Sequence, residues 1–110
     1  MRPDYREAVL DLVATIPAGR ATTYGTIAQV LRGVTGSGGP RQVGRIMAVS
    51  GGQVPWWRVV NTRGEPAPAY RDEALARLRE EGCPLTADGR RVDLRRAGWW
   101  PEITAAADGS

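Results

Sequence analysis

Histidine is absent from this 110-residue chain, and cysteine occurs once, at Cys83. Without an imidazole there is no histidine acid–base catalysis and no histidine-liganded metal. One thiol cannot form an internal disulfide or a structural zinc site. Lysine is missing too, so all 15 basic side chains are arginines. We therefore expect no metal site, no cofactor and no catalytic residue.

Long apolar runs are also lacking. No stretch approaches the roughly 18–20 apolar residues of a membrane span, and the first residues are too polar for a secretory signal. The lone cysteine fits a reducing compartment. With 42% hydrophobic residues, the chain suits one compact domain over residues 1–103 and a flexible tail over 104–110. We expect a cytoplasmic monomer, associated with the nucleoid if bacterial, that makes no membrane contact.

Acidic residues are missing from one long stretch. No Asp or Glu occurs between Pro17 and Gly64, whereas six arginines do, at positions 20, 32, 41, 45, 58 and 63. The rest of the chain carries the other nine arginines and all 12 acids, so the net charge of +3 divides into +6 and −3. Such a basic segment indicates a surface for phosphate, with a generic arginine-rich surface as the alternative.

Apolar residues recur at helical spacing in four segments. The first begins at Tyr5 and ends before Pro17, and the second has Thr23 as its N-cap and ends at Gly33. Pro40 suits the first position of a third helix that closes at residues 50–52. A fourth is expected over residues 72–82. The second and third helices, joined by a glycine-rich turn, have the outline of a helix-turn-helix.

The remaining segments favour little regular structure. Residues 55–61 are expected to be short extended or irregular chain, and Asp88-Gly89 can turn a small hairpin. Residues 99–101 are expected to pack back on the body. The predicted fold class is therefore mainly α: a single small winged-helix-like domain with a helix-turn-helix and a short hairpin or irregular C-terminal segment.

The segment Pro55-Trp56-Trp57-Arg58-Val59 carries the chemical signal. It resembles the alkyl-acceptor motif Pro-Cys-His-Arg-Val, with Trp56 in place of the reactive cysteine and Trp57 in place of the histidine. A thiolate is an activated nucleophile, whereas an indole has no group of low pKa to offer. We therefore expect the pocket to persist and the transfer chemistry to be lost.

Five blocks in order extend this resemblance from Tyr5 to Gly82. They are Ile16-Pro17-Ala18-Gly19-Arg20, Thr23-Tyr24-Gly25, Arg41-Gln42-Val43-Gly44, Pro55 to Asn61, and Glu80-Glu81-Gly82. The chain resembles the DNA-binding domain of O6-alkylguanine-DNA alkyltransferases. It is more similar still to the alkyltransferase-like proteins, which keep that domain and carry tryptophan at the acceptor position. Most of those relatives retain histidine after the tryptophan, so Trp57 is a departure.

The resemblance implies a non-catalytic protein that binds O6-alkylguanine in double-stranded DNA. The helix-turn-helix would enter the minor groove, the alkylated base would rotate into a pocket, and the lesion would be marked for nucleotide excision repair proteins. The DNA-binding and base-flipping residues it implies are Tyr24, Arg41, Gln42, Gly44 and Arg45. The pocket residues it implies are Tyr24, Trp56, Arg58, Val59 and Arg71.

Each implied role has a physical basis and a simpler alternative. Arg41 has a planar guanidinium that can fill a vacated base stack, or it is a solvated helix residue. Tyr24 can stack and hydrogen-bond, or it packs in the core. Trp56 suits an alkyl pocket or plugs the space left by cysteine. For Trp57 we expect packing behind the pocket, and Arg20 and Arg45 are expected to contact phosphate.

Two other functions stay open. The first is a helix-turn-helix regulator that reads undamaged sequence, which the small residues Gly44 and Ala48 disfavour because base-reading helices display several long polar side chains. The second is an active alkyltransferase that uses Cys83. The resemblance implies that the active enzymes generate their thiolate through a Cys–water–His–Glu relay, of which this chain keeps only Glu81.

Overall fold

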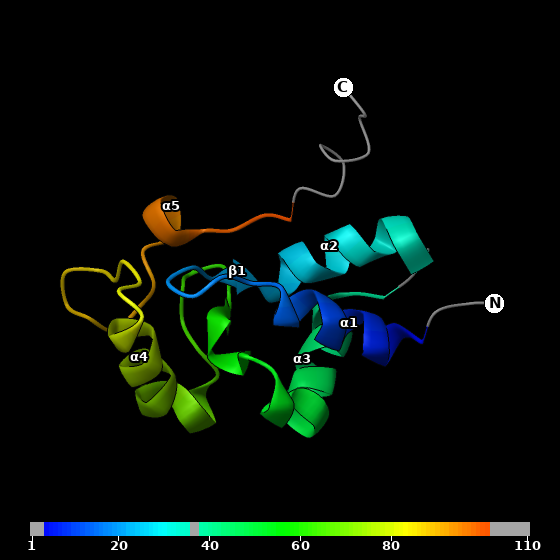
Figure 1. The fold of residues 1–110 in the computed structure, drawn as a ribbon, viewed down its shortest axis with the longest axis horizontal. Helices are drawn as coiled ribbons and strands as arrows, with labels where there is room; N and C mark the ends of the chain where they lie inside the picture. The colour runs from blue at the N-terminus through cyan, green and yellow to red at the C-terminus, as the bar shows by residue number, and fades with distance from the viewer. Residues whose placement is uncertain (1–3, 36–37, 102–110) are drawn as a thin grey trace.

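The computed structural model describes residues 4–35 and 38–101. In chain order the elements are α1 (Tyr5–Ala14), β1 (Thr22–Thr23), α2 (Tyr24–Thr35), α3 (Pro40–Ser50), the 3-10 helices η1 (Gly51–Gln53) and η2 (Trp56–Arg58), β2 (Val59–Val60), the 3-10 helix η3 (Pro68–Tyr70), α4 (Arg71–Glu80) and α5 (Leu94–Ala97). Figure 1 shows α1, α2 and α3 grouped in one half and α4 and α5 in the other. The mainly helical class is confirmed, while the predicted tail lies outside the described residues.

Local signals explain where the helices begin and end. The Thr23 hydroxyl accepts a 3.0 Å hydrogen bond from the Thr26 backbone N–H, so Thr23 is the predicted N-cap of α2. Pro40 is the first residue of α3, as predicted. The chain leaves α4 through Gly82, whose φ of +77° suits glycine. The second helix continues to Thr35, two residues past its predicted end.

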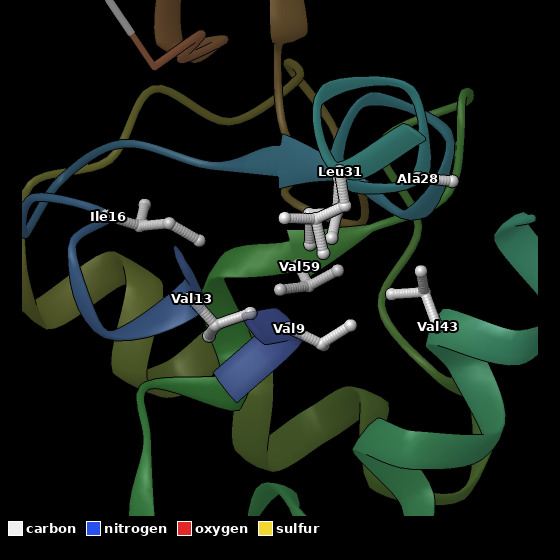
Figure 2. Packing of buried hydrophobic residues seen from close by; sticks show 8 residues of the cluster. Val9, Val13, Ile16, Ala28, Leu31, Val43 and Val59 are labelled. Carbon is white, nitrogen blue, oxygen red and sulfur yellow. The ribbon is translucent and has the colours of Figure 1, made fainter. Parts of the chain in front are cut away.

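Three helices and one strand enclose the main core. Figure 2 shows Val59 of β2 among side chains from α1, α2 and α3. Each buried Val, Leu or Ile contributes about 1.5–3 kcal/mol relative to an exposed one, so this cluster fixes α3 against the rest of the domain. Its buried members are Val9, Val13, Ile16, Ile27, Ala28, Leu31, Val43 and Val59.

A short parallel pair of strands joins two segments that are distant in the sequence. Thr22 of β1 pairs with Val59 of β2, and Thr23 pairs with Val60. The pairing brings the start of α2 beside η2, so Tyr24 and the two tryptophans of the 55–61 segment lie in the same region. Val59 and Val60 are buried as predicted, and the segment itself is 3-10 helix followed by strand.

The C-terminal segment closes a second, smaller core. A bridge between Leu85 and Val92, with Gly89 at φ +71° in the turn, confirms the predicted hairpin. Trp99 packs against the main core, and its backbone N–H donates to the Ala21 carbonyl at 2.8 Å. Trp100 is 52% exposed, so only part of the 99–101 segment packs back. In the described part of the chain, no helix is long and apolar enough to cross a bilayer.

Candidate functional site

A cavity of about 450 Å³ opens between α3, η2 and the segment that leads into α4. The α3 wall consists of Gly44, Met47 and Ala48. Opposite elements contribute aromatic rings and a proline-rich loop, residues 66–70. A cavity of this size, with apolar walls and few polar groups, is typical of a binding site for a small planar molecule.

Four of the sequence-predicted site residues line this cavity: Tyr24, Gly44, Trp56 and Val59. A Cβ atom on Gly44 would lie 4.0 Å from Cδ1 of Tyr24, so the α3 backbone faces the phenol ring closely. Burial raises the pKa of the Tyr24 hydroxyl, which keeps it protonated and able to donate a hydrogen bond near neutral pH. The structure thus brings together residues from α2, α3, η2 and β2.

The outer surface of α3 carries the other predicted DNA-contacting residues. Arg41, Gln42 and Arg45 are all exposed on this helix. Arg41 lies three residues before Gly44, and Arg45 lies three residues before Ala48, so both arginines lie beside the cavity wall on the helix surface. The helix therefore presents positive charge next to a cavity whose lining is mostly apolar.

Two predicted pocket residues do not line the cavity. Arg58 donates from Nε to Glu81 at 3.0 Å and from Nη1 to the Ile16 carbonyl at 2.7 Å, so it ties η2 to the core. Arg71 is the exposed first residue of α4 and lies beside a separate shallow hollow next to Tyr70. Arg58 therefore supports η2, and Arg71 lies outside the cavity wall.

Arg20, expected to contact phosphate, is exposed and also makes two hydrogen bonds within the fold. Its Nε donates to the Ala97 carbonyl at 3.0 Å and its Nη2 donates to the Gly98 carbonyl at 2.6 Å. These carbonyls belong to the last residue and the C-cap of α5, so the guanidinium fastens the end of that helix to the segment that leads into β1. Sequence reasoning could not find this because the partners are backbone atoms more than 70 positions away.

Trp57 lines the cavity, although packing behind the pocket was expected. Its indole Nε1–H donates to Glu81 Oε2 at 2.9 Å. Burial raises the pKa of the Glu81 carboxyl, but hydrogen bonds from Arg58, the Gly19 backbone N–H and Trp57, with the charge of Arg58, outweigh burial and hold the pKa below its ordinary value. Trp57 thus meets an ionised carboxylate.

Cys83 lies away from the cavity. It is 5% exposed within the second core, and burial, with a smaller contribution from the charge of Glu81, raises the pKa of its thiol to about 11. A thiol in that state has almost no thiolate near neutral pH. Among the described residues, no group of three or more potential ligands could hold a metal ion. No thiol or amine side chain from the described part of the chain lines the cavity.

Several cavity residues have no counterpart in the sequence prediction. They are Met47, Gly51 and Gly52 at the end of α3 and in η1, the loop 66–70, and Glu73 and Ala74 of α4. One signal was present, because Gly44, Ala48 and Gly51 follow one another at helical spacing and leave space beside the helix. The loop and α4 carry no comparable pattern, and only the fold brings them to the cavity.

Known proteins match most of this chain. The family model for the DNA-binding domain of 6-O-methylguanine DNA methyltransferase matches residues 4–83. The DNA base-flipping protein of Escherichia coli is 34% identical over 102 residues, which cover 86% of this chain and 74% of that protein. Alkyltransferase-like protein 1 of Schizosaccharomyces pombe is 39% identical over 114 aligned residues, which cover 92% of this chain and all of that protein.

Solved structures agree with the sequence relatives. The crystal structure of S. pombe Atl1 in complex with damaged DNA containing O6-carboxymethylguanine superposes with a TM-score of 0.72 at 35% identity. The alignment covers 92% of this chain and 100% of that one. A second S. pombe structure in complex with DNA gives a TM-score of 0.71. The likeness therefore extends beyond the family model into the C-terminal segment.

Proposed function

We propose a function for this chain from the premise that it belongs to the family of the 6-O-methylguanine DNA methyltransferase DNA-binding domain. It recognises O6-alkylguanine in duplex DNA and receives the flipped base in the cavity beside α3. The observation that carries this proposal is the position of an aromatic-walled cavity directly beside the arginines of that helix. Relatives named as base-flipping and alkyltransferase-like proteins support it.

The arrangement of α3 favours a flipping mechanism. Arg45 neutralises phosphate while Arg41, one turn earlier, fills the space that the base leaves in the stack. Extrusion of a base costs a few kcal/mol, least for a base that pairs poorly. O6-alkylation removes the N1 proton of guanine, so the lesion itself lowers the cost of flipping. Tyr24 then contacts the base within the cavity.

Binding without transfer follows from the side chains present. Trp56 stands where the acceptor cysteine of the active enzymes would be. An indole has no group of low pKa that could act as the nucleophile, so it cannot accept the alkyl group. The one thiol of the chain is buried, with a pKa of about 11. The protein therefore leaves the lesion unchanged, and it acts by marking the site for nucleotide excision repair proteins. We place it in the cytoplasm, on the nucleoid if bacterial, as a monomer.

Matched duplexes that differ by one O6-methylguanine provide the test. Titration at one fixed salt concentration should give a preference of at least tenfold for the lesion, about 1.4 kcal/mol, and intact-protein mass spectrometry should show no gain of methyl mass. Equal affinities would contradict lesion recognition and favour a regulator of undamaged DNA. A gain of one methyl group would establish an alkyltransferase.

A charge-matched pair of variants separates the stack-filling role of Arg41 from general attraction to phosphate. Arg41→Ala should weaken lesion binding on the order of tenfold, whereas Arg95→Ala, at an exposed position of α5, should change it less than about twofold. Arg20 is unsuitable as the control because it holds the C-terminal segment. Equal losses for both variants would mean that α3 contributes only charge.

A further inference from the structure

We propose that Trp57 is a positioning residue that sets lesion selectivity, because it holds the Trp56 wall of the cavity against the fixed carboxylate of Glu81. This inference rests on the proposed function of the same site. It gives a role to the residue that stands in place of histidine in the motif that residues 55–59 resemble.

The first observation is the anchor that Trp57 contacts. Glu81 accepts from Trp57 Nε1 at 2.9 Å, from the Gly19 backbone N–H at 3.0 Å and from Arg58 Nε at 3.0 Å. The Glu81 and Arg58 side chains are each only 15% exposed. Charged hydrogen bonds of this kind are short and directional. Glu81 is therefore a fixed point, and the indole N–H of Trp57 is directed to it.

The second observation is the set of contacts around the two rings. Trp56 and Trp57 meet edge to face, with centroids 5.6 Å apart and an interplanar angle of 87°. Arg77 lies over the Trp57 ring at 4.6 Å, and Arg58 lies over it at 5.4 Å. Tyr70 meets the other indole, Trp56, at 5.8 Å. The orientation of Trp56 therefore depends in part on Trp57, whose ring is held by its hydrogen bond to Glu81.

Holding Trp56 in place should affect only the state in which a flipped base occupies the cavity. A preorganised site loses little side-chain entropy when its ligand arrives, so it binds more tightly than a loose one. The duplex contacts made by α3 do not involve the Trp57 ring, because Arg41 and Arg45 lie on the outer surface. Loss of the Trp57 hydrogen bond should therefore weaken binding of a flipped base and leave binding of undamaged duplex unchanged.

Three variants of the full chain test this. Trp57→Phe keeps a ring and removes the N–H, Trp57→His keeps a donor for Glu81, and Trp100→Phe changes an exposed tryptophan as the control. The readout is the ratio of affinities for an O6-methylguanine duplex and its undamaged match, at one salt concentration, with thermal unfolding as a check on folding. We expect Trp57→Phe to lower this ratio about fivefold to tenfold, and Trp57→His and Trp100→Phe to retain most of it.

The outcomes separate this inference from the function on which it rests. A wild-type ratio of one would overturn both. A wild-type preference that Trp57→Phe retains would overturn the positioning role and leave lesion recognition standing. Equal losses on both duplexes would also overturn it, since they indicate a general role in folding. If Trp57→Phe does not fold, Trp57→His decides, because a folded His variant without selectivity contradicts the hydrogen-bond argument.

Discussion

The carboxylate of Glu81 connects three parts of the molecule. It joins the turn after α1 through Gly19, the cavity wall through Trp57 and the core through Arg58. The resemblance identified this residue as the remnant of a proton relay, and its structural use is different. Here the carboxylate accepts hydrogen bonds that hold the site together.

This role predicts a pH-dependent stability. Glu81→Gln should lower the free energy of unfolding at pH 7 by about 2–3 kcal/mol, because Arg58 loses its partner. The folded-state pKa of Glu81 is depressed, so its contribution is fully present above the ordinary value of 4.5 and is lost as the pH falls through the lowered pKa. Urea unfolding from pH 7 to pH 3 should show the two proteins converging at acid pH.

An exposed neighbour serves as the matched control for that experiment. Glu80→Gln removes the same charge at an exposed position of α4 and should change stability by less than about 0.5 kcal/mol. A constant difference between wild type and Glu81→Gln over the whole pH range would contradict the linkage.

At the scale of elements, α3 combines a structural face and a functional face. Val43 is fully buried in the core, whereas Gly44 and Ala48 line the cavity and Arg41 and Arg45 are exposed. Its start and end followed from Pro40 and the glycines after Ser50, because proline and glycine act locally. The other long helices were predicted from apolar residues that repeat at the spacing of one helix face, although α2 continues two residues past Gly33.

The features that the sequence could not predict are either very short elements or contacts between residues that are far apart in the chain. Strands β1 and β2 have two residues each, too few for a detectable alternation of apolar and polar residues. The place of Arg58, predicted in the pocket and found against Glu81, depends on a chain segment 23 positions away. Tyr24, Trp56 and Val59 were assigned to the pocket through the family resemblance, and they line the cavity.

Gly44 gives a prediction that separates folding from binding. Gly44→Ala should stabilise the protein by about 0.5–1 kcal/mol, because glycine is unfavourable within a helix and the new Cβ would lie 4.0 Å from Tyr24, an ordinary contact. The same methyl group should weaken DNA binding severalfold, since it stands between α3 and its ligand. Thermal unfolding and duplex titration would measure the two effects.

Gly33→Ala is the control for this pair of effects. A Cβ at Gly33 of α2 would meet nothing within 4 Å, so this variant should gain stability without losing DNA affinity. If Gly44→Ala binds DNA as well as wild type does, close approach at this point of α3 is not required.

At the scale of the whole molecule, the fold determines which arginines of the basic stretch between Pro17 and Gly64 remain accessible to phosphate. Of the six arginines between Pro17 and Gly64, Arg20 and Arg58 are held by internal hydrogen bonds. Arg20 is nevertheless exposed, as are the other four, at positions 32, 41, 45 and 63. Only Arg58 is withdrawn from phosphate, by its ion pair with Glu81, so the accessible charge of this segment is one less than the sequence suggests.

The salt dependence of DNA binding should reflect the number of exposed arginines in this segment. Each phosphate that a protein neutralises contributes about −0.9 to the slope of log K against log salt concentration, so the five exposed arginines of this segment predict a slope no steeper than about −4.5. Titration of an undamaged duplex from about 50 to 200 mM NaCl would measure it. A slope near −6 would mean that more cations reach the DNA. The exposed arginines at positions 90, 91, 95 and 96 of the C-terminal segment would then be the first to replace with alanine, and Arg95 could no longer serve as the neutral control for Arg41.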